Sequence, residues 1–361
     1  MKIKLETLGL SEKLRMEANS HPDLFVGRVF SQNKNVYKIM CENGEISAEI
    51  SGKFHFKASN TTDYPAVGDF VLIDRTSDVS GNAIIHYVLT RNSVFARKAA
   101  GTSNNSQIVA SNIDIVFVCM SLNNDFNIRR VERYLSIAWD SGAQPVIVLT
   151  KSDLCDDLDE KLREVESVSI DADILITSSL TNDGYLQVLK YVEEGKTIAF
   201  IGSSGVGKSS LINRLIGDDI IETGGLRNDD KGRHTTTKRE IILLPGGGMV
   251  VDTPGMREIG IETADFSKSF ADVDELAAMC KFNDCSHSNE PGCAVLVAIK
   301  AGELSSDRFE SYKKLKKEAG YDGLNSRQIQ TVKVNEMFKE VGGMKNAKKF
   351  AKAQNAKKHG R

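Results

Sequence analysis

A glycine-rich run in the second half of the chain contains the residue types that bind phosphate groups. Residues 202–209 read G-S-S-G-V-G-K-S, after the apolar run TIAFI and before SLINRLI, which fits a strand, a loop and a helix. Glycines let backbone N–H groups turn toward phosphate oxygens, and the helix N-terminus adds positive potential there. Lys208 can reach the terminal phosphates, and the Ser209 hydroxyl can ligate Mg²⁺. The predicted nucleotide contacts in this run are Gly202, Ser203, Ser204, Gly205, Val206, Gly207, Lys208, Ser209 and Ser210.

Two later motifs add a magnesium and γ-phosphate site. Asp252 to Gly255 reads D-T-P-G and fits D-x-x-G, in which Asp252 would hold Mg²⁺ through water and the Gly255 N–H would sense the γ-phosphate. Between this motif and the phosphate loop lies GRHTTT, where we choose Thr236 as the switch threonine and keep Thr235 as the alternative.

The residue that would orient the attacking water is not the usual glutamine. Met256 follows D-x-x-G at that position, so we expect slow intrinsic hydrolysis that a partner accelerates. His234 is a candidate for this role, and a solvated loop histidine is the alternative. The predicted catalytic residues are Lys208, Ser209, Thr236, Asp252, Gly255 and His234.

Selectivity for guanine is predicted from two motifs that precede the phosphate loop. Thr150, Lys151, Ser152 and Asp153 follow the strand-like run PVIVLT and resemble N-K-x-D with threonine in place of asparagine. The Asp153 carboxylate could accept hydrogen bonds from guanine N1–H and N2–H₂, which adenine cannot donate. Ser178 and Ser179, after ADILIT, would place a backbone N–H on guanine O6. A plain turn at the strand end is the alternative.

The order of these motifs is permuted. In ordinary GTPases the phosphate loop comes first and the guanine motifs last, whereas here residues 150–153 and 178–179 precede residue 202. Chain order does not alter the site if the same strands form the same sheet. The D-x-x-G loop would then lead directly into the C-terminal region.

A cysteine and histidine cluster predicts a metal site. Cys280, Cys285, His287 and Cys293 supply three thiols and an imidazole within fourteen residues. Four ligands leave no open position, so we expect one structural Zn²⁺ rather than a catalytic metal. Free, unrelated thiols are the alternative.

Composition and charge indicate a soluble protein with a localised basic end. The 361 residues have a net charge of −2, no apolar run of membrane-spanning length and no signal-like N-terminus, so we expect a cytoplasmic protein with no membrane partner. The Lys345–Arg361 tail and a predicted helix with Arg308, Lys313, Lys314, Lys316 and Lys317 suggest RNA binding. A solvated face is the alternative.

Hydrophobic patterning divides the chain into three regions. Short β-rich runs over residues 24–90 predict an oligonucleotide-binding (OB)-like barrel, and residues 91–112 are interpreted as a linker or mobile loop. From residue 113, buried-looking strands alternate with helices and predict a parallel, doubly wound sheet. Helices follow after about residue 262. The predicted multidomain α/β architecture is an OB-like barrel (1–95), a circularly permuted P-loop GTPase (96–261) and a helical zinc-binding domain with a basic tail (262–361).

One segment of the barrel could stack on RNA. Lys53 to Lys57 reads K-F-H-F-K and interleaves bases with aromatic rings. We favour the alternative, that these are core residues of a strand.

These features together resemble the ribosome small subunit-dependent GTPases of the RsgA/YjeQ family. The resemblance covers roughly residues 24–320 and includes RNSVFARKAAG, IGSSGVGKSSLIN, GRHTTT, VDTPGMRE and C-x₄-C-x-H-x₅-C. It implies GTP and GDP as ligands with Mg²⁺, and action late in small-subunit maturation. It also implies GTP hydrolysis stimulated by the subunit, and contact with ribosomal RNA through the barrel and the zinc domain.

The sequence thus predicts a monomeric, Mg²⁺-dependent GTPase. Two rival hypotheses remain: an ATPase or kinase built on the same phosphate loop, and an RNA-binding scaffold with a vestigial nucleotide site.

Overall fold

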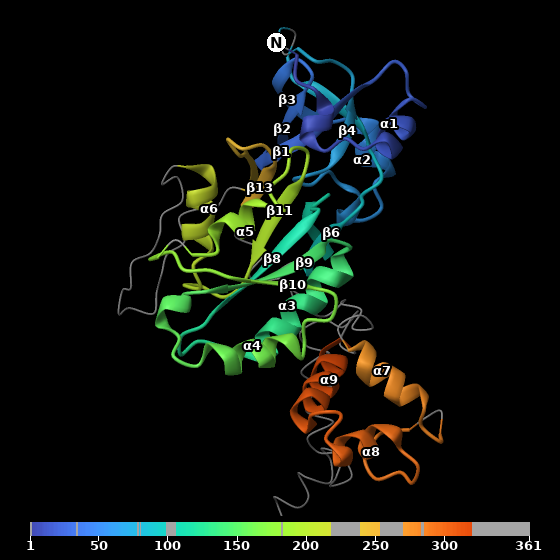
Figure 1. Cartoon of the computed structure of the whole chain (residues 1–361). Coiled ribbons are helices and arrows are strands. Elements are labelled where there is room, and N and C mark those ends of the chain that lie inside the picture. Colours follow the sequence, from blue (N-terminus) through green and yellow to red (C-terminus); the bar gives the residue numbers. More distant parts are fainter. Residues whose placement is uncertain are drawn as a thin grey trace, which may run out of the picture.

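The computed structural model describes residues 2–33, 35–77, 79, 81–98, 106–181, 183–217, 239–252, 270–282 and 285–319. Figure 1 shows three regions along the molecule: a barrel at the N-terminal end, a sheet flanked by helices in the middle, and a helical region at the far end. Within the described residues, no helix combines the length and the apolar character needed to cross a lipid bilayer.

The N-terminal region is a closed five-stranded barrel. Its strands are β1 (Phe25–Asn33), β2 (Val36–Cys41), β3 (Gly44–Ile50), β4 (Phe70–Ile73) and β5 (Ala83–Val88). They pair in the order β1-β2-β3-β5-β4, and β4 closes the barrel by pairing again with β1. All these pairs are antiparallel except β3 with β5. Alternate strand residues such as Ile39, Ile46 and Ile85 fill the interior, as a small barrel requires. The predicted barrel is confirmed.

The segment K-F-H-F-K does not lie in a strand, contrary to the favoured prediction. It forms the short helix α2 (Gly52–Lys57), none of whose residues is buried, and Phe56 is 92% exposed. The Ser51 side chain caps the helix by accepting a hydrogen bond from the Phe54 N–H. The hydroxyl therefore begins a helix at a place where alternating apolar residues suggested a strand.

The stretch interpreted as a linker contains two strands. β6 (Val94–Lys98) and β7 (Ser106–Ser111) pair antiparallel, and the buried side chains of Phe95, Val109 and Ala110 join the main core. The Ser111 hydroxyl also donates to Asp69 in the barrel. Residues 94–98 and 106–111 are thus folded parts of the structure, and the linker interpretation was wrong for them.

The middle region is a six-stranded, mostly parallel sheet. Its strands are β8 (Ile115–Ser121), β9 (Gln144–Thr150), β10 (Asp173–Ile176), β11 (Thr197–Ile201), β12 (Arg239–Leu243) and β13 (Met249–Asp252), in the order β10-β9-β8-β11-β13-β12. Only β12 is antiparallel to its neighbour β13. The long apolar runs predicted these strands because both faces of a parallel sheet are covered. Helices α3 (Ile128–Ser141), α4 (Leu158–Glu166), α5 (Tyr185–Leu189) and α6 (Lys208–Ile216) connect or follow the strands.

Two features fix the barrel to this sheet. β1 pairs with β12, so that barrel and sheet strands form one hydrogen-bonded series of eleven. Arg28 on β1 is fully buried, and its guanidinium donates to the carbonyls of Leu8, Gly68 and Asn112. Burial lowers the pKa of this group to about 10, which still leaves the guanidinium charged at neutral pH. Carbonyl acceptors from three segments compensate the buried charge.

The described part of the C-terminal region contains α7 (Ala271–Ala278), α8 (Ala294–Ala301) and α9 (Ser306–Ala319). It meets the middle region at α3, as seen in the lower part of Figure 1. Phe270 and Val273 are buried and belong to the main hydrophobic core.

Candidate nucleotide site and metal centre

The phosphate loop has the predicted strand, loop and helix context. β11 is buried along its whole length, and the loop from Gly202 leads to α6, which begins at Lys208. Gly202 has φ +149°, and a Cβ there would lie 2.5 Å from the Cys119 carbonyl oxygen. Gly205 and Gly207 also have positive φ values, which L-residues with side chains rarely adopt. Glycine spacing in the sequence therefore reflects both the loop conformation and its close approach to β8.

The Lys208 side chain lies against the phosphate loop. Its side chain is 6% exposed, and Nζ donates to the carbonyls of Gly202 and Ser203 at 2.8 and 2.6 Å. These carbonyls satisfy the ammonium inside the loop, where phosphate oxygens could take their place. The lysine is thus held at the phosphate loop before any ligand arrives.

Thr150 ties the guanine motif to the phosphate loop. It ends β9, is 2% exposed, and its hydroxyl donates to the Val206 carbonyl at 2.5 Å. Its Cβ also lies within contact distance of the position that a Cβ on Gly207 would take. Threonine in place of asparagine therefore keeps a direct bond between the base-recognition loop and the phosphate loop.

The two predicted guanine loops are bonded to each other. The Ser178 hydroxyl donates to Asp153 Oδ1 at 2.5 Å and accepts from the backbone N–H groups of Leu180 and Thr181. Asp153 is exposed, and its Oδ2 makes no hydrogen bond to the part of the chain that the structure describes. Lys151 has the left-handed backbone conformation, with φ +59°. The Ser178 bond thus fixes the carboxylate through Oδ1, and lone pairs on both oxygens remain for further donors.

A cavity of about 650 Å³ opens beside these loops. It lies between the loop after β10 and helix α6, and its lining includes Ser178, Ser179 and Ser210. Neither Asp153 nor Lys208 lines this cavity. The cavity is therefore adjacent to these two predicted nucleotide contacts and does not contain them. The predicted contacts Ser179 and Ser210 face this space.

The structure describes only some of the residues predicted to bind magnesium and the γ-phosphate. Asp252 ends β13, which runs parallel to β11, so it lies at the same sheet edge as the phosphate loop. The predicted residues His234, Thr235, Thr236 and Gly255 lie outside the described residues, as does Met256. Their assignments remain predictions.

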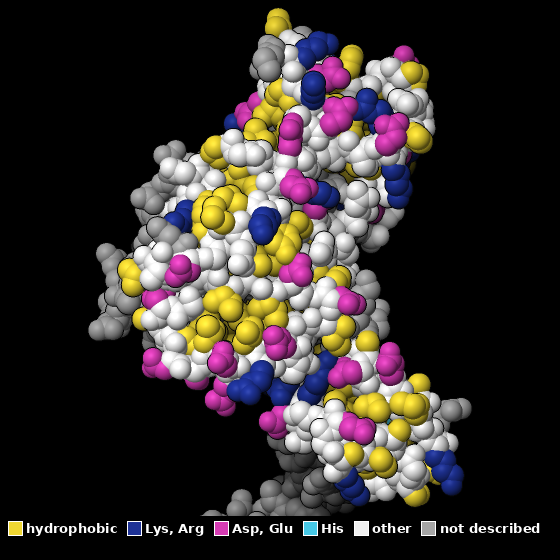
Figure 2. All heavy atoms as spheres, in the orientation of Figure 1, with side chains coloured by type: hydrophobic (Ala, Val, Ile, Leu, Met, Phe, Trp, Pro, Cys, Tyr) yellow, Lys and Arg dark blue, Asp and Glu magenta, His cyan; other side chains and the backbone are white. Residues whose placement is uncertain are grey.

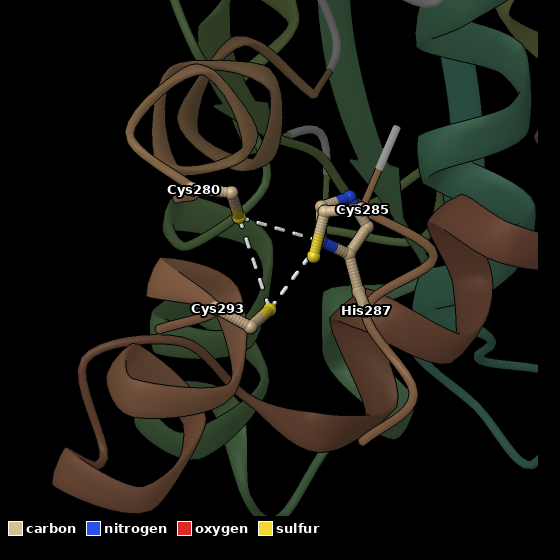
Figure 3. A group of neighbouring side chains, drawn as sticks. All are labelled: Cys280, Cys285, His287 and Cys293. Carbon is tan, nitrogen blue, oxygen red and sulfur yellow. Dashed lines mark hydrogen bonds between the residues drawn. The ribbon is translucent and has the colours of Figure 1, made fainter. Parts of the chain in front are cut away.

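The cysteine and histidine cluster has the dimensions of a zinc site. Tetrahedral coordination with Zn–S near 2.3 Å and Zn–N near 2.0 Å requires separations of about 3.8 Å between sulfurs and about 3.5 Å between sulfur and nitrogen. Cys280 Sγ lies 3.8 Å from Cys293 Sγ, and His287 Nδ1 lies 3.6 Å and 3.4 Å from these two sulfurs (Figure 3). Including Cys285, all four ligand atoms lie within 4.8 Å of one another. The four predicted residues therefore come together around one point.

Local structure prepares these side chains for a cation. Partial burial opposes ionisation of Cys280, but hydrogen bonds from the backbone N–H groups of Val295 and Ala294 outweigh it and lower the pKa of this thiol. Cys293 caps α8 and accepts from the Leu296 N–H. The His287 ring packs edge-on against Phe309 of α9. A metal here would hold α7, α8 and the intervening loop together, which is a structural role.

Two groups near these sites were not singled out from the sequence. Arg130 on α3 donates to the Ser203 hydroxyl in the phosphate loop at 3.0 Å. Glu132 on the same helix is 1% exposed and accepts from Arg308 and Ser311 of α9 at 3.0 and 2.7 Å. Arg308, which the sequence suggested for RNA binding, is instead a buried junction residue, and that prediction was wrong. The charged run N-I-R-R-V-E-R-Y lies in an amphipathic helix, so only tertiary contacts could reveal these roles.

The C-terminal ends of β9, β10, β11 and β13 lie at the same edge of the sheet, because these strands are parallel. The predicted guanine motif at residues 150–153 precedes the phosphate loop in the chain, yet a hydrogen bond from Thr150 joins the two. This arrangement defines a circularly permuted P-loop GTPase.

Comparison with known proteins places the chain within this class. The RsgA GTPase family profile matches residues 88–262. The small ribosomal subunit biogenesis GTPase RsgA 2 of Lactiplantibacillus plantarum is 47% identical over 349 residues, covering 96% of this chain and 98% of that protein. The protein of the same name from Listeria monocytogenes is 43% identical, covering 82% and 84%. This chain belongs to the RsgA GTPase family and is a GTP hydrolase.

Solved structures agree with this assignment. YjeQ from Thermotoga maritima is similar with a TM-score of 0.60 at 29% identity, covering 82% of this chain and 98% of that one. YloQ, described as a circularly permuted GTPase, gives a TM-score of 0.57 at 25% identity, covering 83% and 96%.

Proposed function

We propose that this protein binds the small ribosomal subunit and hydrolyses GTP during late maturation of that subunit, with the subunit stimulating hydrolysis. The observation that carries the proposal is the bonded link between guanine loop and phosphate loop, in a chain that spans nearly all of a relative named for small-subunit biogenesis. We further propose that the protein acts as a monomer in the cytoplasm.

Different residues would bind the phosphates, the base and the magnesium ion. Backbone N–H groups of residues 202–209 and the Lys208 ammonium would hold the phosphates, while Asp153 would accept from the guanine edge. Ser209, Thr236 and Asp252 would hold Mg²⁺, directly or through water, and the ion would neutralise charge on the phosphates. The backbone N–H of Gly255 would sense the γ-phosphate, and His234 would orient the attacking water.

Contact with ribosomal RNA would use local sites rather than one broad basic face. On the face shown in Figure 2, positive and negative side chains are interspersed. The barrel, however, has a cavity of about 490 Å³ whose lining includes Lys53, Phe54, Lys57 and Tyr87. Cations beside aromatic rings suit a phosphate and a stacked base. On α9, Lys313 and Lys314 remain exposed, although Lys313 is paired with Glu310.

The test is GTP turnover with and without purified small subunits, at low and high salt. We expect stimulation by the subunit that weakens as salt rises, because phosphate contacts release counterions. ATP in place of GTP should support little turnover. Turnover that subunits leave unchanged at both salt concentrations would refute the proposed function.

A further inference from the structure

Hydrolysis of GTP develops negative charge on the γ-phosphoryl group that a cation in addition to Lys208 and Mg²⁺ can stabilise. Water forms a bond to the γ-phosphorus while the bond to the β–γ bridging oxygen breaks, and the proton of the water passes to phosphate or solvent. Charge is spread over the equatorial γ-oxygens in the transition state, and an arginine can stabilise it from within the same chain. The phosphate loop of this protein has such an arginine beside it.

Arg130 closes a small network on the phosphate loop. Its Nη1 lies 3.0 Å from the Ser203 hydroxyl and 3.0 Å from Asp125 Oδ2, and the same hydroxyl lies 3.2 Å from that carboxylate oxygen. Ser203 is the second residue of the loop. The guanidinium is therefore at the rim of the phosphate cradle and not at a distant surface.

The fold places Arg130 there for a reason. α3 follows β8, which pairs with β11, the strand that leads into the phosphate loop. Asn127 caps α3 by accepting from the Arg130 N–H, which fixes where the helix begins. The arginine is therefore in the first turn of a helix at the phosphate-binding edge of the sheet.

The guanidinium still has hydrogen-bonding capacity. The Arg130 side chain is 31% exposed, and its Nε and Nη2 donate to no group in the described ranges of the chain. Arg129, the preceding residue, differs because its Nη1 is engaged by both oxygens of buried Glu132. Of these two arginines, Arg130 is the one whose guanidinium contacts the phosphate loop.

We propose that Arg130 is a catalytic residue that stabilises the γ-phosphoryl charge in the transition state, with Asp125 as its resting partner. The guanidinium leaves Asp125 and donates to γ-phosphate oxygens as charge develops on them. This inference rests on GTP hydrolysis at the phosphate loop, and the wild-type protein and Lys208→Ala test that assumption separately.

The experiment is single-turnover hydrolysis of Mg²⁺–GTP by the full chain, together with affinities for GDP and for GDP with aluminium fluoride. Arg130→Ala should lower the rate constant about 20-fold or more, as for other arginines acting in cis, and should abolish the aluminium fluoride complex. Its GDP affinity should stay within about twofold. Arg130→Lys should recover part of the rate, and the matched control Arg129→Ala should behave like the wild type.

Two results would overturn the proposal. One is Arg130→Ala hydrolysing GTP within about twofold of the wild type and still binding aluminium fluoride. The other is an equal loss of GDP affinity and rate, which would make Arg130 a support for the loop only. If the wild type itself is no faster than Lys208→Ala, the GTPase site fails and not the role of Arg130.

Discussion

Replacing Glu132 by alanine should loosen the junction between the C-terminal region and the GTPase sheet. The carboxylate is 1% exposed and bonds to Arg308, Ser311 and Arg129. Arg308 is itself buried, donates to both oxygens of Asp272 and lies 4.9 Å from the centre of the Phe270 ring. Burial alone would lower the pKa of Arg308, but Asp272 and Glu132 outweigh it and raise that pKa. The charge thus depends on two acids, of which the substitution removes one.

The free-energy cost of Glu132→Ala depends on which partners Arg308 retains. Breaking a buried ion pair completely costs about 3–5 kcal/mol. Here Arg308 keeps Asp272, so the main loss is the two charge-assisted hydrogen bonds that Arg308 and Ser311 donate to Glu132, about 1.5 kcal/mol each, while the partly exposed pair with Arg129 adds under about 1 kcal/mol. We expect Glu132→Ala to lower the free energy of undocking or unfolding by about 3 kcal/mol. Arg308→Ala should cost as much, and the two changes together should cost less than their sum.

The assay is urea unfolding with zinc present throughout, combined with limited proteolysis of the C-terminal region. Glu310→Ala is the matched control, because Glu310 lies on α9, is 67% exposed and pairs only with Lys313 among the described residues, so it should cost under about 1 kcal/mol. If Glu132→Ala unfolds and resists protease like Glu310→Ala, the buried junction does not stabilise the protein as argued.

Three further predictions concern the two sites. Gly202→Ala should lose measurable GDP binding by calorimetry, since its Cβ would meet the Cys119 carbonyl at 2.5 Å; unchanged binding would contradict the loop geometry. Thr150→Val should weaken GDP binding about tenfold by removing the bond to Val206, whereas Thr150→Ser should not; equal affinities for the two would dismiss this link. Removing zinc with a chelator should melt the circular dichroism signal of α7 and α8 yet preserve GDP binding, and a zinc-free protein with an unaltered melting curve would refute a structural metal.

The candidate nucleotide and metal residues could be located in the sequence because their chemistry demands fixed spacing. A phosphate loop needs glycines at set positions, and four zinc ligands need to be within reach of one ion. The parallel strands were predictable as well, since burial on both faces leaves long apolar runs. The structure bonds Thr150 to the phosphate loop and Asp153 to Ser178 of the second guanine loop, as the permuted order implied.

Other features depend on tertiary contacts that no local pattern reveals. Phe54 and Phe56 alternate as in a strand, but the Ser51 cap makes the segment helical. Arg308 reads as one more cation on a basic helix, and only the approach of Glu132, far away in the chain, makes it a buried junction residue. The position of Arg130 beside the phosphate loop is likewise evident only from its contact with Ser203.

The central claim, that loops permuted in the chain bind one guanine nucleotide, is tested most directly at Asp153. Affinities for GDP and xanthosine diphosphate should be measured for the wild type and Asp153→Asn. The wild type should prefer GDP. The variant should bind GDP about 100-fold more weakly, from the loss of two charge-assisted hydrogen bonds, and should gain affinity for the xanthine nucleotide, whose C2 carbonyl accepts from an amide. GDP affinity unchanged by Asp153→Asn would contradict the account.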